Sequence, residues 1–336
     1  MEFLARSNEI VHPSGLRLKT PCLIPSFSSK GFESSNKRKS EAAFWIDFHK
    51  QFLEKYMLVS AFDIYHGFIP RPKSFVCTDI TFIDSGGYES SPMFDSSSDK
   101  KINSELEEWK YEYLLEVYDK WDHKRFPAVF VNYDHHKHRK KMLKQVSSAM
   151  KLFNKYPEQL SDFLIKPETA KEQFLNVNNI LKNVHLLKKF NIIGFTEKEL
   201  GKSICDRMTS IYRIRKELDS KSIDTPIHVF GSLDPLSCIL YFLVGAEIFD
   251  GLTWLRYAYR DGISIYHSNN NVLSNDIHTE EKQNLATMTM KNITYLNKLR
   301  AMMIDFIAEQ DFSKFEGIGD TILKNFNSFK NTLNKQ

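Results

Sequence analysis

The sequence of 336 residues predicts an α/β fold, a (β/α)8 barrel. Eight short apolar segments are expected as strands, centred near Leu23, Leu58, Phe82, Val129, Leu164, Ile192, Val229 and Ile248. Most of these segments are separated by stretches with helical spacing. Apolar strands that alternate with helices are typical of a parallel sheet covered on both faces. An open, doubly wound sheet is the alternative, but no Gly-x-Gly-x-x-Gly motif follows the first strand.

Composition limits the class of protein. A hydrophobic content of 42% allows a large core, and a net charge of +4 is compatible with a polyanionic partner without indicating one. No apolar run reaches the roughly 18 residues that a membrane span needs. The N-terminus lacks the basic-then-apolar order of a signal peptide. The four cysteines are scattered, without metal-ligand or redox spacing, so a reduced cytoplasmic protein with no membrane partner is expected.

The first third of the chain is expected to start with a hairpin. Leu16 and Leu18 alternate with basic residues, which suggests a short hairpin strand. Pro21 ends this strand, and a second strand starts at Leu23. Apolar residues at helical spacing predict a helix over residues 42–56. An apolar strand then runs over residues 57–63 and ends at Asp63.

The remaining helices follow from their apolar stripes. They are expected over residues 102–121, 140–156, 169–189, 203–219, 235–244 and 285–309. Residues 268–275 are rich in Asn and Ser and are expected to form a loop. No domain linker stands out. One domain is therefore predicted, with a hairpin over residues 1–22, a barrel over 23–262 and C-terminal helices over 263–336.

The stretch Thr81–Ser90 stands out because it places a carboxylate, two glycines and an aromatic ring directly after an apolar strand. Asp84 follows the strand, Gly86 and Gly87 allow a sharp turn and a close approach, and Tyr88 offers a flat face. Such a set is suited to a flat polar ligand such as a nucleobase. The alternative is an ordinary strand followed by an Asp-Ser-Gly turn.

Four carboxylates lie at or just past strand ends: Asp63, Asp84, Asp134 and Asp250. In a barrel the carboxyl ends of the strands share one face, where active sites lie. Any single one of them could instead cap a helix or complete a turn. The run His135-His-Lys-His138 follows the fourth strand, and we interpret it as a basic loop near nucleic-acid phosphates, with a metal site as the alternative.

Several motifs together resemble the tRNA-guanine transglycosylase (queuine tRNA-ribosyltransferase) family. Asp84-Ser-Gly-Gly-Tyr88 resembles the family signature Asp-Ser-Gly-Gly-(Phe/Tyr)-Gln. The stretches 228–231 and 245–250 are similar to the approach to the nucleophilic aspartate of the family, and Arg256 follows at the family spacing. Residues 130–134 resemble the strand whose Asp holds the purine. The resemblance runs from about residue 6 to 309 at low identity.

The resemblance implies a (β/α)8 barrel that exchanges a base in a nucleic acid without a cofactor. Asp250 would be the nucleophile and Asp84 the general acid and base, as in retaining glycoside hydrolysis. The residues implied to contact the base and its sugar are Asp134, Tyr88, Ser85, Gly194 and Ser60. Arg256 and Arg260 would hold phosphate.

The departures from the family pattern indicate which nucleic acid, DNA or tRNA, is the substrate. No cysteine lies between about residues 266 and 285, where the family places its zinc ligands. We therefore expect the zinc subdomain of the family to be reduced or absent, and no structural zinc. Glu89 replaces the signature Gln, and the loop after Gly194 differs from the family loop. The chain is most similar to a divergent bacterial branch that inserts 7-deazaguanines, such as 7-cyano-7-deazaguanine, into DNA.

Three hypotheses follow. A transglycosylase acting on DNA is favoured, one acting on tRNA is the alternative, and a non-catalytic relative that binds nucleic acid or a partner is the third. Retention of both Asp84 and Asp250 argues against the third. Partners would be the nucleic acid and the incoming base, and the need for helper proteins that open the duplex is left open.

Overall fold

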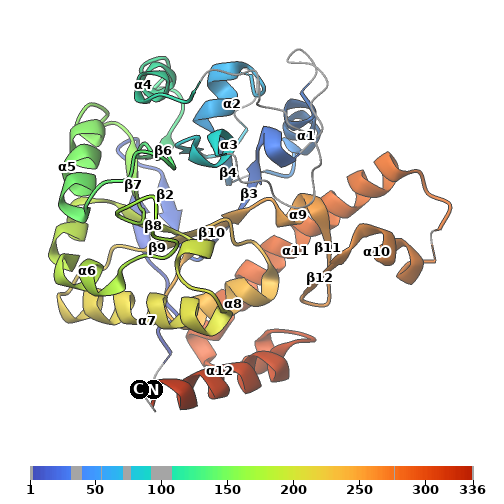
Figure 1. Ribbon diagram of the computed structural model, residues 1–336. Coiled ribbons are helices and arrows are strands. Elements are labelled where there is room, and N and C mark those ends of the chain that lie inside the picture. Colours follow the sequence, from blue (N-terminus) through green and yellow to red (C-terminus); the bar gives the residue numbers. More distant parts are fainter. Residues whose placement is uncertain are drawn as a thin grey trace.

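The computed structural model describes residues 3–31, 40–53, 55–70, 77–91, 108–275 and 277–334. It contains a closed barrel of eight parallel strands in the order β10-β3-β4-β5-β6-β7-β8-β9, surrounded by helices (Figure 1). The strands are β3 (Cys22–Phe27), β4 (Tyr56–Ser60), β5 (Ile80–Asp84), β6 (Ala128–Val131), β7 (Leu160–Ile165), β8 (Ile192–Thr196), β9 (Ile227–Phe230) and β10 (Ile248–Gly251). The predicted (β/α)8 barrel is therefore confirmed.

Alternation along the strands separates two apolar cores. In β5, Phe82 belongs to the cluster inside the barrel, whereas Ile83 belongs to the larger cluster between the strands and the helices. The same alternation holds in β6, where Val129 lies inside and Phe130 lies outside. Because both faces of the strands are largely buried, most of their residues are apolar in the sequence.

The N-terminal hairpin closes one end of the barrel. Its strands, β1 (Glu9–Val11) and β2 (Arg17–Lys19), pair in an antiparallel manner. The strand predicted around Leu16 and Leu18 is β2, whereas β1 was not predicted. Leu18 is fully buried in the interior cluster, together with the first residues of several barrel strands. The hairpin therefore covers the amino ends of the strands and leaves the carboxyl ends for a site.

The helices between the strands are shorter than expected in three places. α1 (Glu41–His49) ends before the predicted residue 56. α4 covers only Tyr111–Asp119, because buried Trp109 and the extended Lys110 hold the preceding chain outside the helix, and residues 101–107 lie outside the described part. The predicted helix over 169–189 is two pieces, α6 (Val177–Lys182) and η4 (Val184–Lys189). The side chain of Asn176 accepts from the Asn179 amide and so starts α6 late.

Three helices agree more closely with the prediction: α5 (Met142–Phe153), α7 (Ile204–Ser220) and α8 (Pro235–Leu243). The short elements α2 (Ala61–His66), α3 (Gly87–Ser90), η1 (Ser29–Gly31) and η5 (Glu197–Glu199) were not predicted. The predicted strand over 57–63 was too long, since Ala61 already begins α2. Asp63 therefore lies in the first turn of a helix rather than at a strand end.

The segment after the barrel contains a hairpin that the sequence analysis missed. α9 (Thr253–Arg256) leads into β11 (Tyr257–Arg260) and β12 (Ile263–Tyr266), so residues 263–336 begin with a strand and not with a helix. The expected loop over 268–275 is wrong, because α10 (His267–Leu273) covers most of it. α11 (Glu281–Glu309), η6 (Phe312–Lys314) and α12 (Gly319–Leu333) follow.

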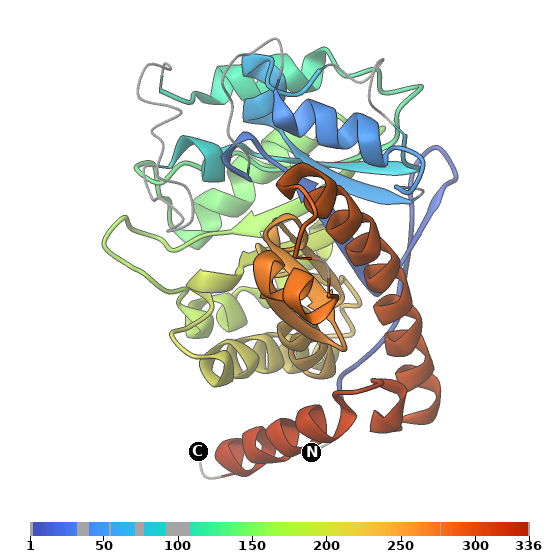
Figure 2. The same ribbon diagram turned by 90° about the vertical axis from the view of Figure 1, so that its right-hand side faces the viewer.

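The N-terminal segment lies beside helix α12 (Figures 1 and 2). The ring of Phe3 stacks on that of Phe326 in α12, with 4.9 Å between the two centroids. It also meets the ring of Phe306 in α11 edge-on, at a centroid distance of 5.2 Å. Aromatic contacts therefore fasten the N-terminal segment to the C-terminal helices. Among the described helices, none has both the length and the apolar character that crossing a membrane requires.

Candidate active site

Strand alternation points a set of polar side chains into the barrel interior. They share the face of their strands with the interior apolar cluster, and they are Ser26, Ser60, Asp84, Asp162, His228 and Asp250. Ser60 and Asp84 end neighbouring strands and are paired in register. A group of titratable side chains therefore lies at and below the open, carboxyl end of the barrel.

Asp250 lies in β10 and is held by three hydrogen-bond donors. Its Oδ2 accepts from Ser26 Oγ at 2.7 Å. Its Oδ1 accepts from His228 Nε2 at 3.1 Å and from the Gly231 amide at 3.2 Å. The side chain is 7% exposed. Donors to both oxygens fix the orientation of the carboxyl group.

His228 joins Asp250 to a second buried carboxylate. Its Nδ1 lies 2.7 Å from Asp162 Oδ2, and both side chains are fully buried. Burial lowers the pKa of His228, but the charges of Asp162 and Asp250 outweigh burial and raise it to about 9. The imidazole is therefore protonated at neutral pH and donates to both carboxylates.

Asp84 is distinguished by burial and by the negative charges around it. Burial raises the pKa of Asp84 to about 8, and the negative charges of Glu89 and Asp250 add to this effect. Its Oδ1 is buried without a hydrogen-bond partner in the described part of the chain. Asp84 is therefore neutral at pH 7 and carries a proton that it can give to a ligand.

A buried polar cluster near the end of β4 contains Glu89, whose charge helps to raise the pKa of Asp84. Glu89 accepts hydrogen bonds from Ser28 and from Ser60, the latter at 2.7 Å. Asp63 accepts from the Ser29 amide at 2.8 Å, and burial together with the charge of Glu89 raises the pKa of Asp63 well above its usual value. The hydroxyl of Ser60, predicted to lie near the sugar, is thus bonded to Glu89.

Asp134 follows β6 and is paired with cations. Its Oδ1 lies 2.6 Å from Arg139 Nη1, and its Oδ2 lies 3.4 Å from Lys166 Nζ. Both cations also contact Glu199, at 3.4 Å and 2.9 Å. The carboxylate of Asp134 is therefore already paired with two cations.

The Gly-Gly turn is explained by the protein's own packing. Gly86 has a φ of 83°, and a Cβ there would lie 2.8 Å from Phe62 and 2.9 Å from Trp109. A Cβ on Gly87 would lie 2.6 Å from an oxygen of Asp134. The sequence predicted that another group approaches the two glycines closely. In the structure, the groups that approach them are side chains of the protein itself.

The other residues predicted to contact the base, Ser85, Tyr88 and Gly194, differ in their exposure to solvent. Ser85 is buried, and its carbonyl accepts from the Trp109 indole at 2.8 Å, so it helps build the turn. Tyr88 is 39% exposed, and the ammonium group of Lys30 lies 4.7 Å from its ring centroid. Gly194 is buried in β8, where a Cβ would lie 2.4 Å from the ring of Phe230. Tyr88 alone among these three presents an exposed face to a ligand.

The two predicted phosphate ligands follow the last barrel strand. Arg256 ends α9 and is partly buried. Arg260 ends β11, is 39% exposed, and has Asp261 as its ion partner at 3.9 Å. Within the described part of the chain, Arg260 forms no ion pair with Asp84 or Asp250. The barrel therefore brings the predicted carboxylates together but not Arg260.

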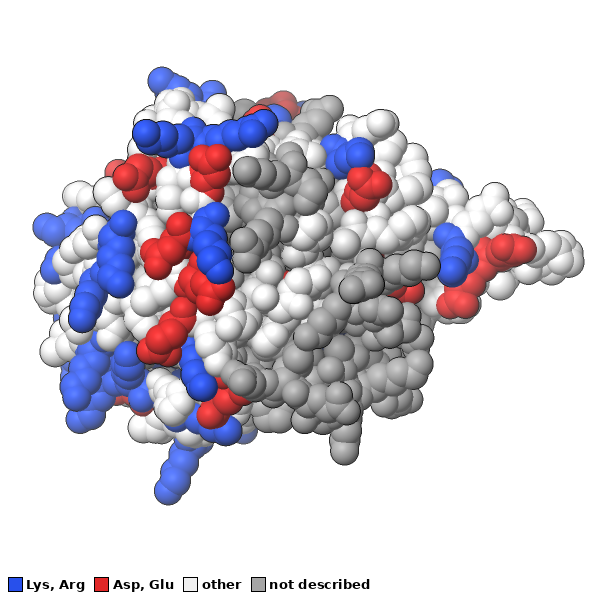
Figure 3. Space-filling model, turned by 90° about the horizontal axis from the view of Figure 1, so that it is seen from above, with Lys and Arg blue, Asp and Glu red and all other residues white. Residues whose placement is uncertain are grey.

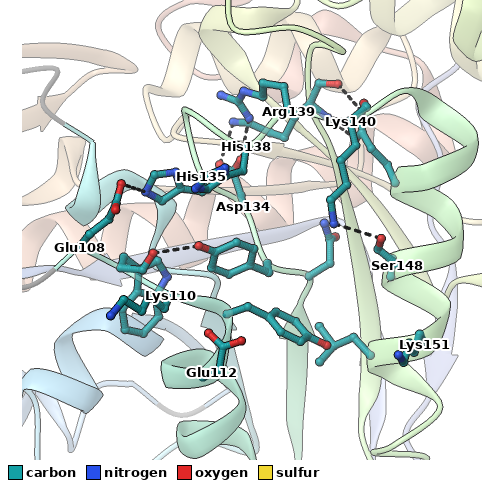
Figure 4. Close-up of a pocket in the computed structure, with 18 of the residues that line it drawn as sticks. Glu108, Lys110, Glu112, Asp134, His135, His138, Arg139, Lys140, Ser148 and Lys151 are labelled. Carbon is teal, nitrogen blue, oxygen red and sulfur yellow. Dashed lines mark hydrogen bonds and ion pairs between the residues drawn. The ribbon is translucent and has the colours of Figure 1, made fainter.

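A hollow of about 570 Å³ lies beside Asp134 (Figure 4). Its lining includes Asp134, Arg139 and Lys166, and it is bordered by Glu108 and His138. Neither Asp84 nor Asp250 contributes to this lining. Glu108, His135 and His138 are the described residues that could together hold a metal ion.

Sequence analysis missed Asp162 and His228 as site residues. The predicted strand near Leu164 began after Asp162, although β7 starts at Leu160. His228 was noted only as part of a motif. Charged residues are almost never fully buried unless paired, so an Asp and a His inside otherwise apolar strands were the available signal.

The chain was also compared with known proteins. A scan against models of protein families finds no match to this chain, and a search of curated proteins finds no significant match.

Proposed function

We propose that this protein is a nucleic-acid guanine transglycosylase that replaces guanine in DNA by a 7-deazaguanine base. The observation that carries the proposal is the contrast between two carboxyl groups at the same end of the barrel. Asp84 is protonated at neutral pH, whereas Asp250 is held by three hydrogen-bond donors. One proton donor and one oriented carboxylate are the two groups that retaining glycosyl transfer needs.

In the first half-reaction, an oxygen of Asp250 forms a bond to the sugar C1′ while the glycosidic bond to guanine breaks. Asp84 gives its proton to the departing base, which takes the electron pair of that bond. In the second half-reaction, ionised Asp84 accepts a proton from the incoming 7-deazaguanine. The nitrogen of that base attacks C1′ and releases Asp250, so one glycosidic bond replaces another.

Asp162 and His228 support the nucleophile and contact no substrate in this scheme. Protonated His228 orients Asp250 through Nε2 and compensates part of its charge inside the barrel. Asp162 holds the ring through Nδ1. They are positioning residues, in the same sense as the carboxylate that orients the histidine of a catalytic triad.

Base recognition is assigned to the neighbourhood of Asp134 and Tyr88. Asp134 offers carboxylate oxygens to the N1 and N2 groups of a purine, and the exposed ring of Tyr88 offers a stacking face. Because Arg139 and Lys166 already pair with Asp134, base binding must compete with or rearrange these ion pairs.

A polymeric substrate is supported by surface charge. Lys and Arg side chains gather on the left of the view in Figure 3, the side on which α5 lies in Figure 1, with acidic residues among them. Lys140, Lys151 and Lys155 line the hollow beside Asp134. Such side chains can neutralise phosphates without reading sequence. The expected absence of the zinc subdomain favours DNA over tRNA.

The test is base exchange measured on both polymers in parallel. Purified protein is incubated with a 7-deazaguanine and with DNA or tRNA that carries labelled guanine. Release of label from DNA, lost in Asp250→Asn but kept in the exposed-site control Asp47→Asn, supports the proposal. Release from tRNA alone would contradict the choice of polymer. Release from neither would contradict the enzymatic proposal and favour a non-catalytic relative.

A further inference from the structure

Three potential metal ligands gather at the rim of the hollow beside Asp134. Glu108, His135 and His138 each offer one ligand atom, and these atoms all lie within 4.8 Å of one another. Figure 4 shows Glu108 facing His135, with His138 beside them. Two imidazoles and one carboxylate form a donor set that zinc and similar divalent metals favour.

Local backbone structure explains why the two histidines converge. Residues 135–138 form a turn in which the His138 amide donates to the His135 carbonyl at 3.1 Å. A turn brings residues three apart within about 7 Å between their Cα atoms. The two imidazole rings consequently lie with their centroids 4.8 Å apart. Consecutive histidines could not all face one ion, but the first and last of this turn can.

The third ligand comes from a segment that is fixed to the same turn. The hydroxyl of Tyr133 donates to the carbonyl of Trp109 at 2.8 Å, and the indole of Trp109 is buried and bonded to Ser85. Glu108, which precedes Trp109, is thereby held opposite His135. Its Oε1 lies 3.9 Å from His135 Nε2.

We propose that Glu108, His135 and His138 bind one divalent transition-metal ion of the zinc type. Ligands about 2.1 Å from a tetrahedral ion lie about 3.4 Å from each other. The separation of 3.9 Å between Glu108 and His135 is close to this value. Glu108 and His138 are exposed and can rotate to close the remaining distance, while buried His135 provides the fixed ligand.

The surroundings define how the ion would be held. Lys137 Nζ now lies 2.9 Å from Glu108 Oε1, so the ion must displace an exposed ammonium group. Three protein ligands leave a fourth position open, as in catalytic rather than structural zinc sites. That position borders the hollow, where water or an anionic oxygen of a ligand can complete the coordination.

The test is metal binding by the full chain after chelator treatment. Calorimetric titration with Zn²⁺ and absorption spectroscopy with Co²⁺ are applied to the wild type, Glu108→Gln, His138→Gln and the matched control His136→Gln. Because Glu108 and His138 are exposed, their substitutions are expected to leave the fold intact, which circular dichroism checks.

The proposal predicts one ion per chain, at least about tenfold weaker binding in Glu108→Gln and His138→Gln, and unchanged binding in His136→Gln. The Co²⁺ spectrum should be that of a four-coordinate site without thiolate bands. Equal binding by all four proteins, no stoichiometric binding by the wild type, or a thiolate band from one of the four free cysteines would overturn it. These measurements are independent of base exchange.

Discussion

The imidazole of His228 bridges two carboxylates inside the barrel, with Nδ1 2.7 Å from Asp162 and Nε2 3.1 Å from Asp250. The three side chains come from β7, β9 and β10, and they are buried below the open end of the barrel. Removing one member of such a group leaves an unpaired buried charge, which is costly. The bridge therefore both stabilises the barrel interior and fixes the proposed nucleophile.

His228 is expected to affect the chemical step more than substrate binding. His228→Asn removes the donor to Asp250, so kcat for base exchange should fall by about 10–100-fold with little change in KM. Steady-state kinetics with saturating DNA measure both constants. If His228 had only a structural role, kcat per folded molecule would instead stay unchanged in His228→Asn. Active-site titration gives the concentration of folded molecules that this comparison needs.

The same bridge makes stability depend on pH. The pKa of His228 is raised from 6.5 to about 9, so the folded protein binds the proton more tightly than the unfolded chain. The resulting stabilisation is fully present below pH 6.5 and is lost as the pH rises through 9. Urea unfolding between pH 6 and 9.5 should show this decline.

The control for this pH dependence is the double variant Asp162→Asn/His228→Asn, which removes both partners. Asp84, whose proton is also lost in this range, remains in both proteins, so its contribution cancels in the comparison. The double variant should lose less stability than the wild type over the same interval. Equal losses would show that the bridge is not the titrating element.

Asp84 should limit activity at high pH. Because its pKa is raised to about 8, the acid form needed for guanine departure is lost above that value. The rate of guanine release should therefore fall about tenfold per pH unit beyond the apparent pKa. Asp84→Asn should be inactive at every pH. A rate that stays constant up to pH 9.5 would exclude Asp84 as the acid.

Asp134 should contribute to stability as well as to base binding. Lys166 is 12% exposed and is held by Asp134 and Glu199, so Asp134→Asn leaves it one carboxylate instead of two. The free energy of unfolding should fall by about 1–3 kcal/mol. Urea unfolding measures the change.

The matched control is Asp47→Asn, since Asp47 pairs with Lys50 on the surface and is 71% exposed. It should change stability by less than about 1 kcal/mol. Equal effects of the two substitutions would mean that the ion pairs of Asp134 contribute no more than a surface pair does.

The barrel could be predicted because its strands are apolar on both faces. Burial between the interior and the helices leaves a continuous apolar run, as in β6, and such runs are visible in the sequence. The hairpin β11–β12 was missed because Tyr257 and Tyr266 lie in short, half-exposed strands without that pattern. Helix α4 was predicted too long because the tertiary anchoring of Trp109 overrides helical periodicity.

The carboxylates of the site were predictable from their positions after strands, but their partners were not. Asp84 and Asp250 are found at the same end of the barrel, as the topology requires. The cations on Asp134 come from residues 5 and 32 positions away, and pairings of this kind depend on side-chain packing. The bridge through His228 likewise joins residues 66 positions apart, so no local pattern indicated it.

The proposed mechanism requires a covalent bond between Asp250 and the sugar, and adduct mapping detects such a bond. Protein and DNA are mixed without an incoming base, denatured with acid and digested, and the peptides are analysed by mass spectrometry. We expect a deoxyribose-linked adduct on the peptide that contains Asp250, absent from Asp250→Asn and retained in Asp47→Asn. An adduct on another residue, or base exchange that proceeds in Asp250→Asn, would show that Asp250 is not the nucleophile.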